Sequence, residues 1–332
     1  MYFSIEQIDP HNEPALKAWW EVGQAATAGR ASMPWPVWEQ MRSIATTTNP
    51  ERALVFLAAI DGREMVGAAL AAHPLLENTH GVELELYVRP DRRREGIATA
   101  LLAEAEALTR GAGRTTVWSA ALVPPGGTAP GEAFAHARGF DVASRESMKE
   151  LTMADYRARR QAALDAVGGA SDGYEIVTFD TVCPEEHLVS FGRLLGMLNA
   201  EIPLGDLDLA DAEWTPERMR AAEQRQVAIG RHVLTAIAIA PGGTVAGASD
   251  VRVNDTSPTQ GQVGITLVDP GHRGRRLGLA LKVATHDLAL SSYPRLRSVE
   301  TSNAEVNTHM NAVNEQLGYR TVETVLELQK KL

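Results

Sequence analysis

Apolar and polar positions follow the same series of patterns twice along the chain. Each half opens with a strand-like stretch, Phe3–Ile8 or Tyr174–Phe179, followed by a helical region. Two apolar runs joined by a glycine-containing turn come next, at 54–70 and 233–249. Apolar runs separated by such a turn are typical of an antiparallel hairpin. The pattern therefore predicts a strand, a helical region and a hairpin in each half.

A strand, a basic turn and a helix follow each predicted hairpin. The predicted strands are Val82–Val88 and Val263–Val268, and the predicted helices are Ile97–Arg110 and Leu277–Leu290. Each half then has another strand, a short helix and a closing strand. These later strands are predicted at Thr115–Ser119, Met148–Thr152, Ser298–Thr301 and Val322–Leu328. The order of elements predicts an α/β fold with a mixed sheet, an α+β arrangement centred on the strand–turn–helix unit.

The strand–turn–helix sequences are themselves repeated. VRPDRRREGIATALL (88–102) corresponds to VDPGHRGRRLGLALK (268–282) at an offset of 180 residues, from 268 minus 88. RGF (138–140) corresponds to LGY (317–319) at an offset of 179, from 317 minus 138. A nearly constant offset across several elements indicates a duplicated domain rather than a short-period repeat.

The duplication predicts two tandem domains, at 1–153 and 173–332. The segment between them, 154–172, starts as a polar helical pattern and ends in glycine and serine, which is typical of a linker. A chain of 332 residues is also longer than one typical domain.

Composition limits the kinds of partner. The net charge is -10 and the pI is about 5.4, so the arginines of the two turns are a local basic feature of an acidic protein. General nucleic-acid binding usually requires a basic face. The N-terminus lacks the pattern of a signal peptide, and the longest apolar run, 53–60, is too short to span a bilayer. We therefore expect a cytoplasmic protein, a monomer or homodimer, with no nucleic-acid or membrane partner.

The basic turns have the features of a diphosphate site. Backbone N–H groups in the first turn of a helix lack partners inside the helix, and the helix dipole adds positive potential there. In the second half, Gly274 allows a close turn of the backbone and Arg273 adds a permanent charge. Arginines that merely decorate a solvated helix are the alternative. Repetition of the turn in both halves favours a phosphate-bearing ligand.

Two motifs carry a resemblance to a known superfamily. The first, Val-x-Pro followed by Arg/Gln-x-x-Gly-x-Gly/Ala, is complete in the first half, whereas the second half has Arg276 where glycine is usual. The matching residues are Val88, Pro90, Arg93, Gly96, Ala98, Val268, Pro270, Arg273 and Gly278. The second motif, an Asn and a later Leu-Gly-aromatic, is present as Asn307 and LGY, with Thr128 and Gly139-Phe140 in the first half. On these motifs each half resembles a GCN5-related N-acetyltransferase (GNAT) domain. The chain resembles a tandem member, similar in architecture to mycothiol synthase.

The resemblance implies two GNAT-like acyl-CoA N-acyltransferase domains, with acetyl-CoA or another acyl-CoA as donor and no metal. The pyrophosphate would lie on one of the two turns, and the pantetheine arm would pair along the preceding strand. The implied donor-binding residues are Val88, Arg93, Arg94, Glu95, Gly96, Ile97, Ala98, Val268, Arg273, Gly274, Arg275, Arg276, Leu277, Gly278, Asn303 and Asn307. The implied reaction is direct attack of a neutral amine on the thioester.

The family's general acid is missing from both halves. The tyrosine that commonly fills this role is replaced by Ala135 in the first half and by Asn314 in the second. Asn314 can donate a hydrogen bond but cannot act as an acid. Tyr87 or Tyr319 could substitute, or each could be an ordinary strand or core residue.

The second half is expected to be the catalytic copy because it keeps Asn307. Helical spacing would place Asn303, Asn307, Asn311 and Asn314 on one face, where their amides could bind pantetheine or water. The expected catalytic residues are therefore Asn307 and Asn314. Glu83 of the first half is the candidate base; it shares a strand face with Glu85, which is also typical of a solvent-facing side.

The acceptor is predicted to meet the first helices of a half. In the second half this region carries Glu201, Asp206 and Asp208, whose carboxylates could attract a cationic amine or could be ordinary loop and cap residues. The first half has an aromatic surface, 33–38, as a pocket wall or as interface packing. The predicted function is N-acetyl transfer from acetyl-CoA to a primary amine of a small molecule. A non-catalytic acyl-CoA-binding scaffold and a mycothiol-synthase-like transferase are the alternatives.

Overall fold

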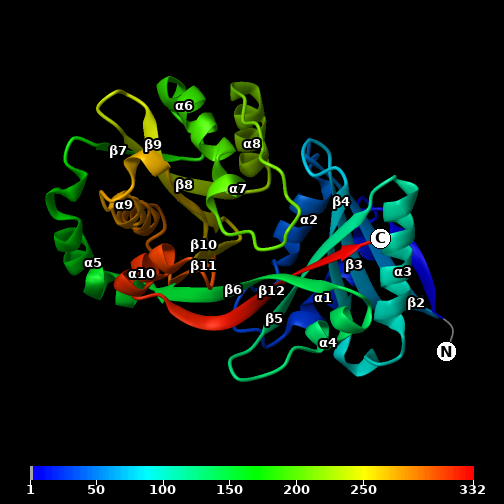
Figure 1. Cartoon of the computed structure of the whole chain (residues 1–332). Helices are drawn as coiled ribbons and strands as arrows, with labels where there is room; N and C mark the ends of the chain where they lie inside the picture. Colours follow the sequence, from blue (N-terminus) through cyan, green and yellow to red (C-terminus); the bar gives the residue numbers. More distant parts are fainter. Residues whose placement is uncertain (1–2) are drawn as a thin grey trace. The chain divides into compact units, whose positions relative to one another are not determined.

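The computed structural model describes residues 3–332, which divide into two compact units (Figure 1). The N-terminal unit consists of the described residues up to Arg145 with Gly205–Asp208 and Val325–Leu332, and the C-terminal unit consists of Glu146–Leu204 and Leu209–Thr324. Strands and helices alternate in both units, and parallel and antiparallel strand pairs occur in each. The predicted α/β fold with a mixed sheet is therefore confirmed. Within 3–332, no helix is long and apolar enough to cross a membrane.

Six strands of the N-terminal unit lie in the order β1-β2-β3-β4-β5-β12. The elements are β1 (Ser4–Ile8), α1 (Glu13–Thr27), α2 (Trp38–Thr46), β2 (Arg52–Asp61), β3 (Glu64–Pro74), β4 (Gly81–Val88), η1 (Pro90–Arg92), α3 (Ile97–Gly111), β5 (Thr116–Val123), α4 (Pro130–Ala137) and the end of β12 (Arg320–Lys331). Strands β1 to β4 are antiparallel neighbours, and β4 pairs in parallel with β5. The hairpin predicted at 54–70 is β2–β3.

Helix α1 covers one face of this sheet with tryptophans. The side chain of Asn12 caps the start of the helix, and Trp19 is fully buried. The Trp19 indole donates to the carbonyl oxygens of Leu57, at 3.0 Å, and Ala69, at 3.2 Å. A separate apolar cluster that includes Leu101 of α3 packs on the other face. The strand–turn–helix unit β4–η1–α3 is thus built from a buried strand and a buried helix face.

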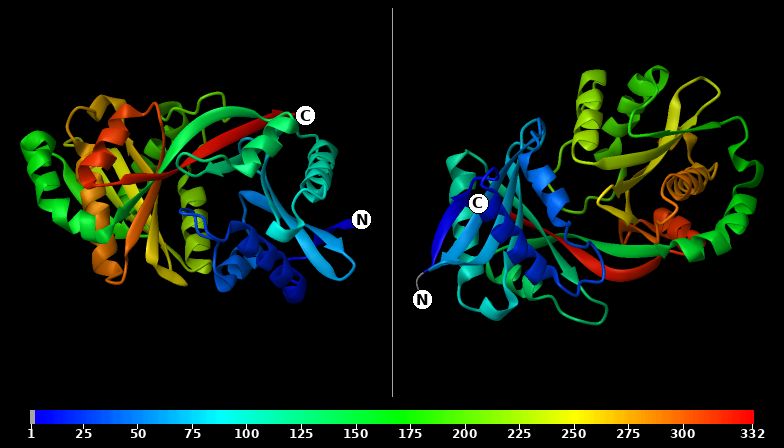
Figure 2. Two further views of the ribbon diagram at one scale, coloured as in Figure 1. Left: turned by 90° about the horizontal axis from the view of Figure 1, so that it is seen from below. Right: turned by 180° about the vertical axis from the view of Figure 1, so that it is seen from behind.

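The C-terminal unit repeats this arrangement with the strand order β6-β11-β10-β9-β8-β7. Its elements are β6 (Asp141–Thr152), α5 (Met153–Val167), η2 (Gly168–Ser171), β7 (Glu175–Asp180), α6 (Glu185–Gly196), α7 (Leu198–Glu201), α8 (Pro216–Ala228), β8 (Arg231–Ile239), β9 (Val245–Asn254), β10 (Ser257–Val268), η3 (Pro270–His272), α9 (Leu277–Ser292), β11 (Ser298–Ala304) and α10 (Thr308–Leu317). Helices α6 and α8 pack on one face of the central strands, and α9 packs on the other (Figure 2).

The closing strands do not lie where chain order predicts. The second part of β6 pairs antiparallel with β11 inside the C-terminal unit, from Glu146 opposite Ala304 to Thr152 opposite Ser298. The end of β12 belongs to the N-terminal unit, where the N–H of Leu332 donates to the carbonyl of Thr115 at 2.8 Å. Each half of the chain therefore supplies the closing strand of the other unit, and the units differ from the predicted division into 1–153 and 173–332.

The segment expected to be a linker, 154–172, is mostly helix α5 and packs into the C-terminal unit. Tyr156 is fully buried, and its hydroxyl donates to the Asp287 carboxylate at 2.8 Å. Arg160 forms an ion pair with the same carboxylate at 2.7 Å. Only a narrow stripe of the helix, including Ala163 and Val167, faces the core. The other positions are mostly polar, so the helix has a polar sequence although it is packed against the unit.

Candidate functional site

The two basic turns have the same backbone geometry. In the N-terminal unit, Arg94 and Gly96 have left-handed backbones, with φ of 70° and 84°. In the C-terminal unit, Gly274 and Arg276 have φ of 80° and 53°. These positions correspond at the offset of 180, so arginine and glycine have exchanged places between two left-handed sites. Arg276 therefore keeps the turn that the family's glycine makes.

Arg276 holds this conformation against its own preference. A left-handed backbone costs a residue with a Cβ atom about 1 kcal/mol, and glycine avoids that cost. We expect Arg276→Gly to raise the free energy of unfolding of the ligand-free protein by about 1 kcal/mol. Gly96→Arg, the converse change in the other unit, should lower it by a similar amount. Urea denaturation measures the free energy of unfolding of both variants. A lower value for Arg276→Gly than for the unchanged protein would contradict the presence of backbone strain at Arg276.

Both turns face open space in front of a helix start. Among the described residues other than the chain neighbours, no heavy atom lies within 4 Å of a Cβ built on Gly96 or Gly274. Gly96 and Arg276 are the residues directly before α3 and α9, whose first-turn N–H groups lack partners within the helix. Three pairs of predicted donor-binding residues surround these turns. Val88 and Val268 end the preceding strands. Ile97 and Leu277 begin the helices and are buried, and Ala98 and Gly278 are the next residues of the helices.

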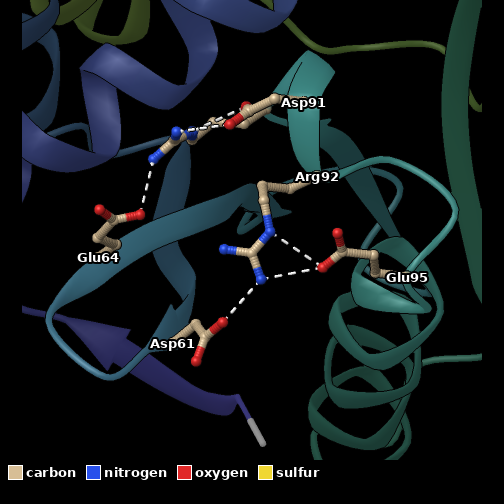
Figure 3. Close-up of polar contacts among 6 residues, drawn as sticks. Asp61, Glu64, Asp91, Arg92 and Glu95 are labelled. Carbon is tan, nitrogen blue, oxygen red and sulfur yellow. Dashed lines mark hydrogen bonds and ion pairs between the residues drawn. The ribbon is translucent and has the colours of Figure 1, made fainter. Parts of the chain in front are cut away.

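In the N-terminal turn, two of four arginines are neutralised. Arg92 lies between the carboxylates of Asp61, at 2.7 Å, and Glu95, at 2.9 Å (Figure 3). Glu95 is thus directed to Arg92 rather than outward, while Arg89 is paired with Glu64 and Asp91. The paired carboxylates hold the turn in shape.

The other two arginines keep their charge for a ligand. Arg93 donates to the carbonyl of Ala26 at 3.2 Å, a neutral partner. Within residues 3–332, no carboxylate forms an ion pair with Arg93 or Arg94. Two exposed, uncompensated guanidinium groups beside open N–H groups favour a phosphate.

The C-terminal turn is neutralised at the corresponding arginine. Arg273 forms an ion pair with Glu201, a residue predicted to bind the acceptor. Arg275 lies 5.9 Å from the ring centroid of Tyr174, whose hydroxyl bonds to His272 at 2.8 Å. The Glu201 carboxylate of the same unit therefore takes the place that an anionic ligand would have beside Arg273.

The strands before the turns separate in the way an extended ligand requires. β4 pairs with β5 only from Gly81–Glu83 to Thr116–Trp118. β10 pairs with β11 only from Gln260–Gln262 to Ser298–Glu300. Beyond these residues, within 3–332, no ladder pairs join β4 to β5 or β10 to β11, although the Ser119 hydroxyl donates to the Leu84 carbonyl at 2.7 Å. A pantetheine arm could add like a strand at these edges.

The face of β4 under α1 carries acidic and aromatic side chains. Glu85 accepts a hydrogen bond from the Tyr87 hydroxyl at 2.6 Å. Trp35 packs edge-on against Tyr87 with ring centroids 4.8 Å apart, so part of the predicted aromatic surface 33–38 lies over this strand. Burial, with the Glu85 carboxylate, raises the pKa of Tyr87 well above its ordinary value. Glu83, the predicted base, forms an ion pair with Arg52.

A buried acid in the C-terminal unit was not predicted from the sequence. The β9–β10 pairing shifts register between Val263 and Thr266, and the Asp250 carboxylate accepts the N–H of Gly264 there at 2.9 Å. Arg252 pairs with Asp250 at 3.3 Å, and burial raises the pKa of that carboxyl. The available signal was an aspartate in the middle of a mostly apolar strand, VAGASDVRV, with an arginine two residues later.

The predicted row of amides on one helix face is wrong because Asn303 lies in β11. Asn307 is the N-cap of α10 and accepts the N–H of Met310 at 3.2 Å. Asn311 accepts a hydrogen bond from Lys149, and Asn314, fully buried, donates to Asn303 at 2.5 Å. These amides bind one another and the local backbone.

Two further predicted residues lie in the core. Tyr319 is buried, and its hydroxyl bonds to His286 at 2.7 Å, so it is a core residue. Ala135 is buried in the apolar cluster of the N-terminal unit.

The three predicted acceptor carboxylates do not form one cluster. Glu201 belongs to the C-terminal unit, whereas Asp206 and Asp208 belong to the N-terminal unit. Asp208 is paired with Lys331 and lies 3.4 Å from His80. The pairing with Lys331 lowers the pKa of the Asp208 carboxyl. These three carboxylates therefore do not form one binding site for a cationic amine.

Comparisons with known proteins agree with this geometry. Residues 17–140 match the model of the Acetyltransferase (GNAT) family. A tandem GNAT protein from the clavulanic acid biosynthesis pathway is similar over 99% of this chain and 98% of its own, at 26% identity and a TM-score of 0.83. A GCN5-related N-acetyltransferase from Sphaerobacter thermophilus is similar over 99% and 95%, at 16% identity and 0.67. N-myristoyltransferase of Saccharomyces cerevisiae is similar over 99% and 79%, at 10% identity and 0.59. A search of curated proteins found no match.

Proposed function

We propose that this chain, whose residues 17–140 match the Acetyltransferase (GNAT) family and which is similar along its length to a tandem GNAT protein, transfers an acyl group from acyl-CoA, in particular acetyl-CoA, to the amine of a small molecule. The observation that carries the proposal is the open left-handed turn before α3, with two uncompensated arginines. A pyrophosphate is the ligand that such a turn accommodates best.

We place the productive donor site in the N-terminal unit. Arg93 and Arg94 keep their charge there, whereas Glu201 neutralises Arg273 in the other turn. In the C-terminal unit the Asp250 carboxylate also accepts the N–H of Gly264 on β10, so this backbone donor is not free for a ligand. This choice differs from the expectation, based on Asn307, that the second half is catalytic.

The face of β4 under α1 suits an amine acceptor. Glu85 supplies a carboxylate that can attract a cationic amine and take its proton, and Tyr87 supplies a hydroxyl that stays protonated. Trp35 limits the face on one side with an aromatic wall. The neutral amine then attacks the thioester carbon, the carbon–nitrogen bond forms and the carbon–sulfur bond breaks. Tyr87 is the donor placed to protonate the leaving thiolate, and the proton lost from nitrogen restores the Tyr87 hydroxyl.

A direct test measures CoA release from acetyl-CoA in the presence of a panel of small primary amines. Amine-dependent release, with acetylated product, supports the proposal. Tight acetyl-CoA binding without turnover on any amine would favour the scaffold alternative. Absence of both binding and turnover would reject the proposal.

Charge reversal at the N-terminal turn should weaken donor binding. A charge-assisted hydrogen bond contributes about 1.5–3 kcal/mol, so we expect Arg93→Glu to raise the Kd for acetyl-CoA about 10- to 100-fold. Calorimetry on the full chain measures the change. Arg63→Glu makes the same charge change at an exposed arginine of the same unit and should leave the Kd within about threefold. Equal effects of the two variants would contradict a site at this turn.

A further inference from the structure

Arg30 is a cation beside the face of β4 that the proposed acceptor uses. It lies in the loop 28–37, which joins α1 to α2, and its guanidinium carbon is 5.9 Å from the ring centroid of Tyr87. Arg30 is exposed, and among the residues that the structure describes no carboxylate forms an ion pair with it. An exposed arginine elsewhere would be an ordinary surface residue. Here its permanent charge is available to an anionic group of a ligand on β4.

The Glu85 carboxylate and the Arg30 guanidinium both act on the Tyr87 side chain. Glu85 accepts the hydrogen bond of the Tyr87 hydroxyl at 2.6 Å. Burial raises the pKa of Tyr87, the Glu85 carboxylate raises it further, and the Arg30 guanidinium lowers it, so both charges are near this hydroxyl. Within 3–332, Glu85 and Arg30 nevertheless form no ion pair with each other or with other side chains. One negative and one positive group therefore lie beside Tyr87 with their charges unneutralised.

Tryptophans hold the loop that carries Arg30 in place. The Trp20 indole donates to the carbonyl of Pro36 at 2.7 Å, and the Trp35 indole donates to the carbonyl of Trp20 at 3.1 Å. A Cβ atom on Gly23 would lie 2.1 Å from the Trp35 ring, so glycine at this position lets the ring pack directly on α1. The loop therefore has a fixed shape, and little backbone ordering accompanies the binding of a ligand to Arg30.

The corresponding strand of the C-terminal unit is apolar at these positions. At the offset of 180, Glu85 and Tyr87 correspond to Ile265 and Leu267, which pack in the apolar cluster that includes α6. The fold therefore accepts apolar side chains at both positions, and packing does not require the carboxylate and the hydroxyl of the N-terminal unit. Their presence beside Arg30 favours a ligand that carries charges of both signs.

We propose that the acceptor is an amino acid, which carries its amine and a carboxylate close together, and that Arg30 is the residue that selects it. This inference rests on the proposed amine acetylation in the N-terminal unit. Glu85 binds the ammonium group and takes its proton. The planar guanidinium of Arg30 binds the carboxylate, to which it can donate two parallel hydrogen bonds. The carboxylate is unchanged by the reaction, and the product is an N-acetylated amino acid.

The same two charges discriminate against other amines. An amino acid amide leaves the Arg30 guanidinium without an anionic partner, and a polyamine places a second cation beside it. A simple alkylamine can bind Glu85 but gains nothing from Arg30. A preference for a carboxylate over a carboxamide, dependent on Arg30, is therefore the measurable consequence.

The experiment compares amino acids with their carboxamides as acceptors, by CoA release from acetyl-CoA on the full chain. We expect kcat/KM to be about 10- to 100-fold higher for the amino acid, the scale of a charge-assisted hydrogen bond. Arg30→Gln should remove this advantage, chiefly through KM, and should leave the carboxamides within about threefold. Arg30→Lys keeps the charge without the planar fork and should give an intermediate loss.

The deciding quantity is the change in the ratio of the two kcat/KM values on mutation, because removing the carboxylate also changes the basicity of the amine. Arg63→Gln removes an exposed arginine of the same unit and should leave the ratio as it is. An unchanged ratio in Arg30→Gln, or an equal change in Arg63→Gln, would overturn the inference. A higher Kd for acetyl-CoA in Arg30→Gln, with the ratio unchanged, would assign Arg30 to the donor site and overturn it as well.

Calorimetry with amino acids in the presence of CoA separates this inference from the proposed function. If amino acids bind, Arg30→Gln weakens their binding and no amine is acetylated, the proposed function fails and the role of Arg30 stands. If simple amines are acetylated as well as amino acids are, the inference fails alone. Absence of both amino acid binding and turnover would reject both.

Discussion

Replacing Glu85 with glutamine is expected to lower kcat/KM for the amine acceptor about 100-fold, because a positioned general base typically contributes 100-fold or more. Glutamine keeps the shape of the side chain and an oxygen that can accept the Tyr87 hydroxyl, but it cannot take a proton. The loss should therefore appear in turnover, while the Kd for acetyl-CoA stays unchanged. Steady-state kinetics and calorimetry on the same preparation measure the two quantities.

Two matched variants decide whether Glu85 is the base. Glu104→Gln changes an exposed carboxylate on α3 and should have no effect. Glu83→Gln changes the carboxylate that is paired with Arg52 and should have a smaller effect than Glu85→Gln. A greater loss in Glu83→Gln would assign the base to the residue that the sequence predicted and contradict the assignment to Glu85.

Replacing Lys282, which lies on α9 and is 1% exposed, with leucine is expected to stabilise the protein by a few kcal/mol below pH 7. Burial lowers the pKa of Lys282 from its ordinary value to about 7. At about 1.4 kcal/mol for each pKa unit, the buried ammonium destabilises the native state by an amount of this order. Leucine removes the charge, and leucine is also the residue at the corresponding N-terminal position, Leu102, at the offset of 180.

The pH dependence of this stabilisation has a definite sign. Between pH 7 and 10.5 the unfolded chain keeps the Lys282 proton and the folded chain does not. The free energy of unfolding of the protein with Lys282 in place therefore rises with pH in this range. The advantage of Lys282→Leu should therefore be largest below pH 7 and shrink as pH rises toward 10.5. Urea denaturation at several pH values measures it. Lys331→Leu, at an exposed lysine, should change stability by less than about 1 kcal/mol without this slope. A pH-independent gain in Lys282→Leu would show that packing, not charge, is responsible.

The local chemistry of the turns could be predicted from the sequence because it depends on neighbouring residues. Proline, arginine and glycine at fixed spacing predict a strand end, a tight turn and a helix start, and these lie at Val88–Ile97 and Val268–Leu277. Even the exception, Arg276, follows a local rule, since its left-handed backbone takes the place of Gly96. Duplication made both predictions stronger by repeating the pattern.

Features that depend on pairing between distant strands could not be predicted. The closing strands have the same apolar pattern whichever sheet they join, so the pairing of β6 with β11 is not encoded locally. Asp250 reaches Gly264 only because β10 shifts register against β9. The amides were misplaced because β11 extends to Ala304, which puts Asn303 in a strand. In each case a residue's role is set by a partner that lies far away in the chain.

The exchange of closing strands also bears on how the two copies have been inherited. A gene fragment that encoded only one half would lack the strand that completes its sheet, since β6 and the end of β12 are supplied across the duplication. Selection for one working site therefore retains both copies, whatever happens to the chemistry of the other. A copy that is indispensable as a scaffold is free to lose its original ligand geometry and to accumulate groups such as Glu201, Asp250 and Lys282. Divergence of the second site is, in this view, a consequence of shared strands.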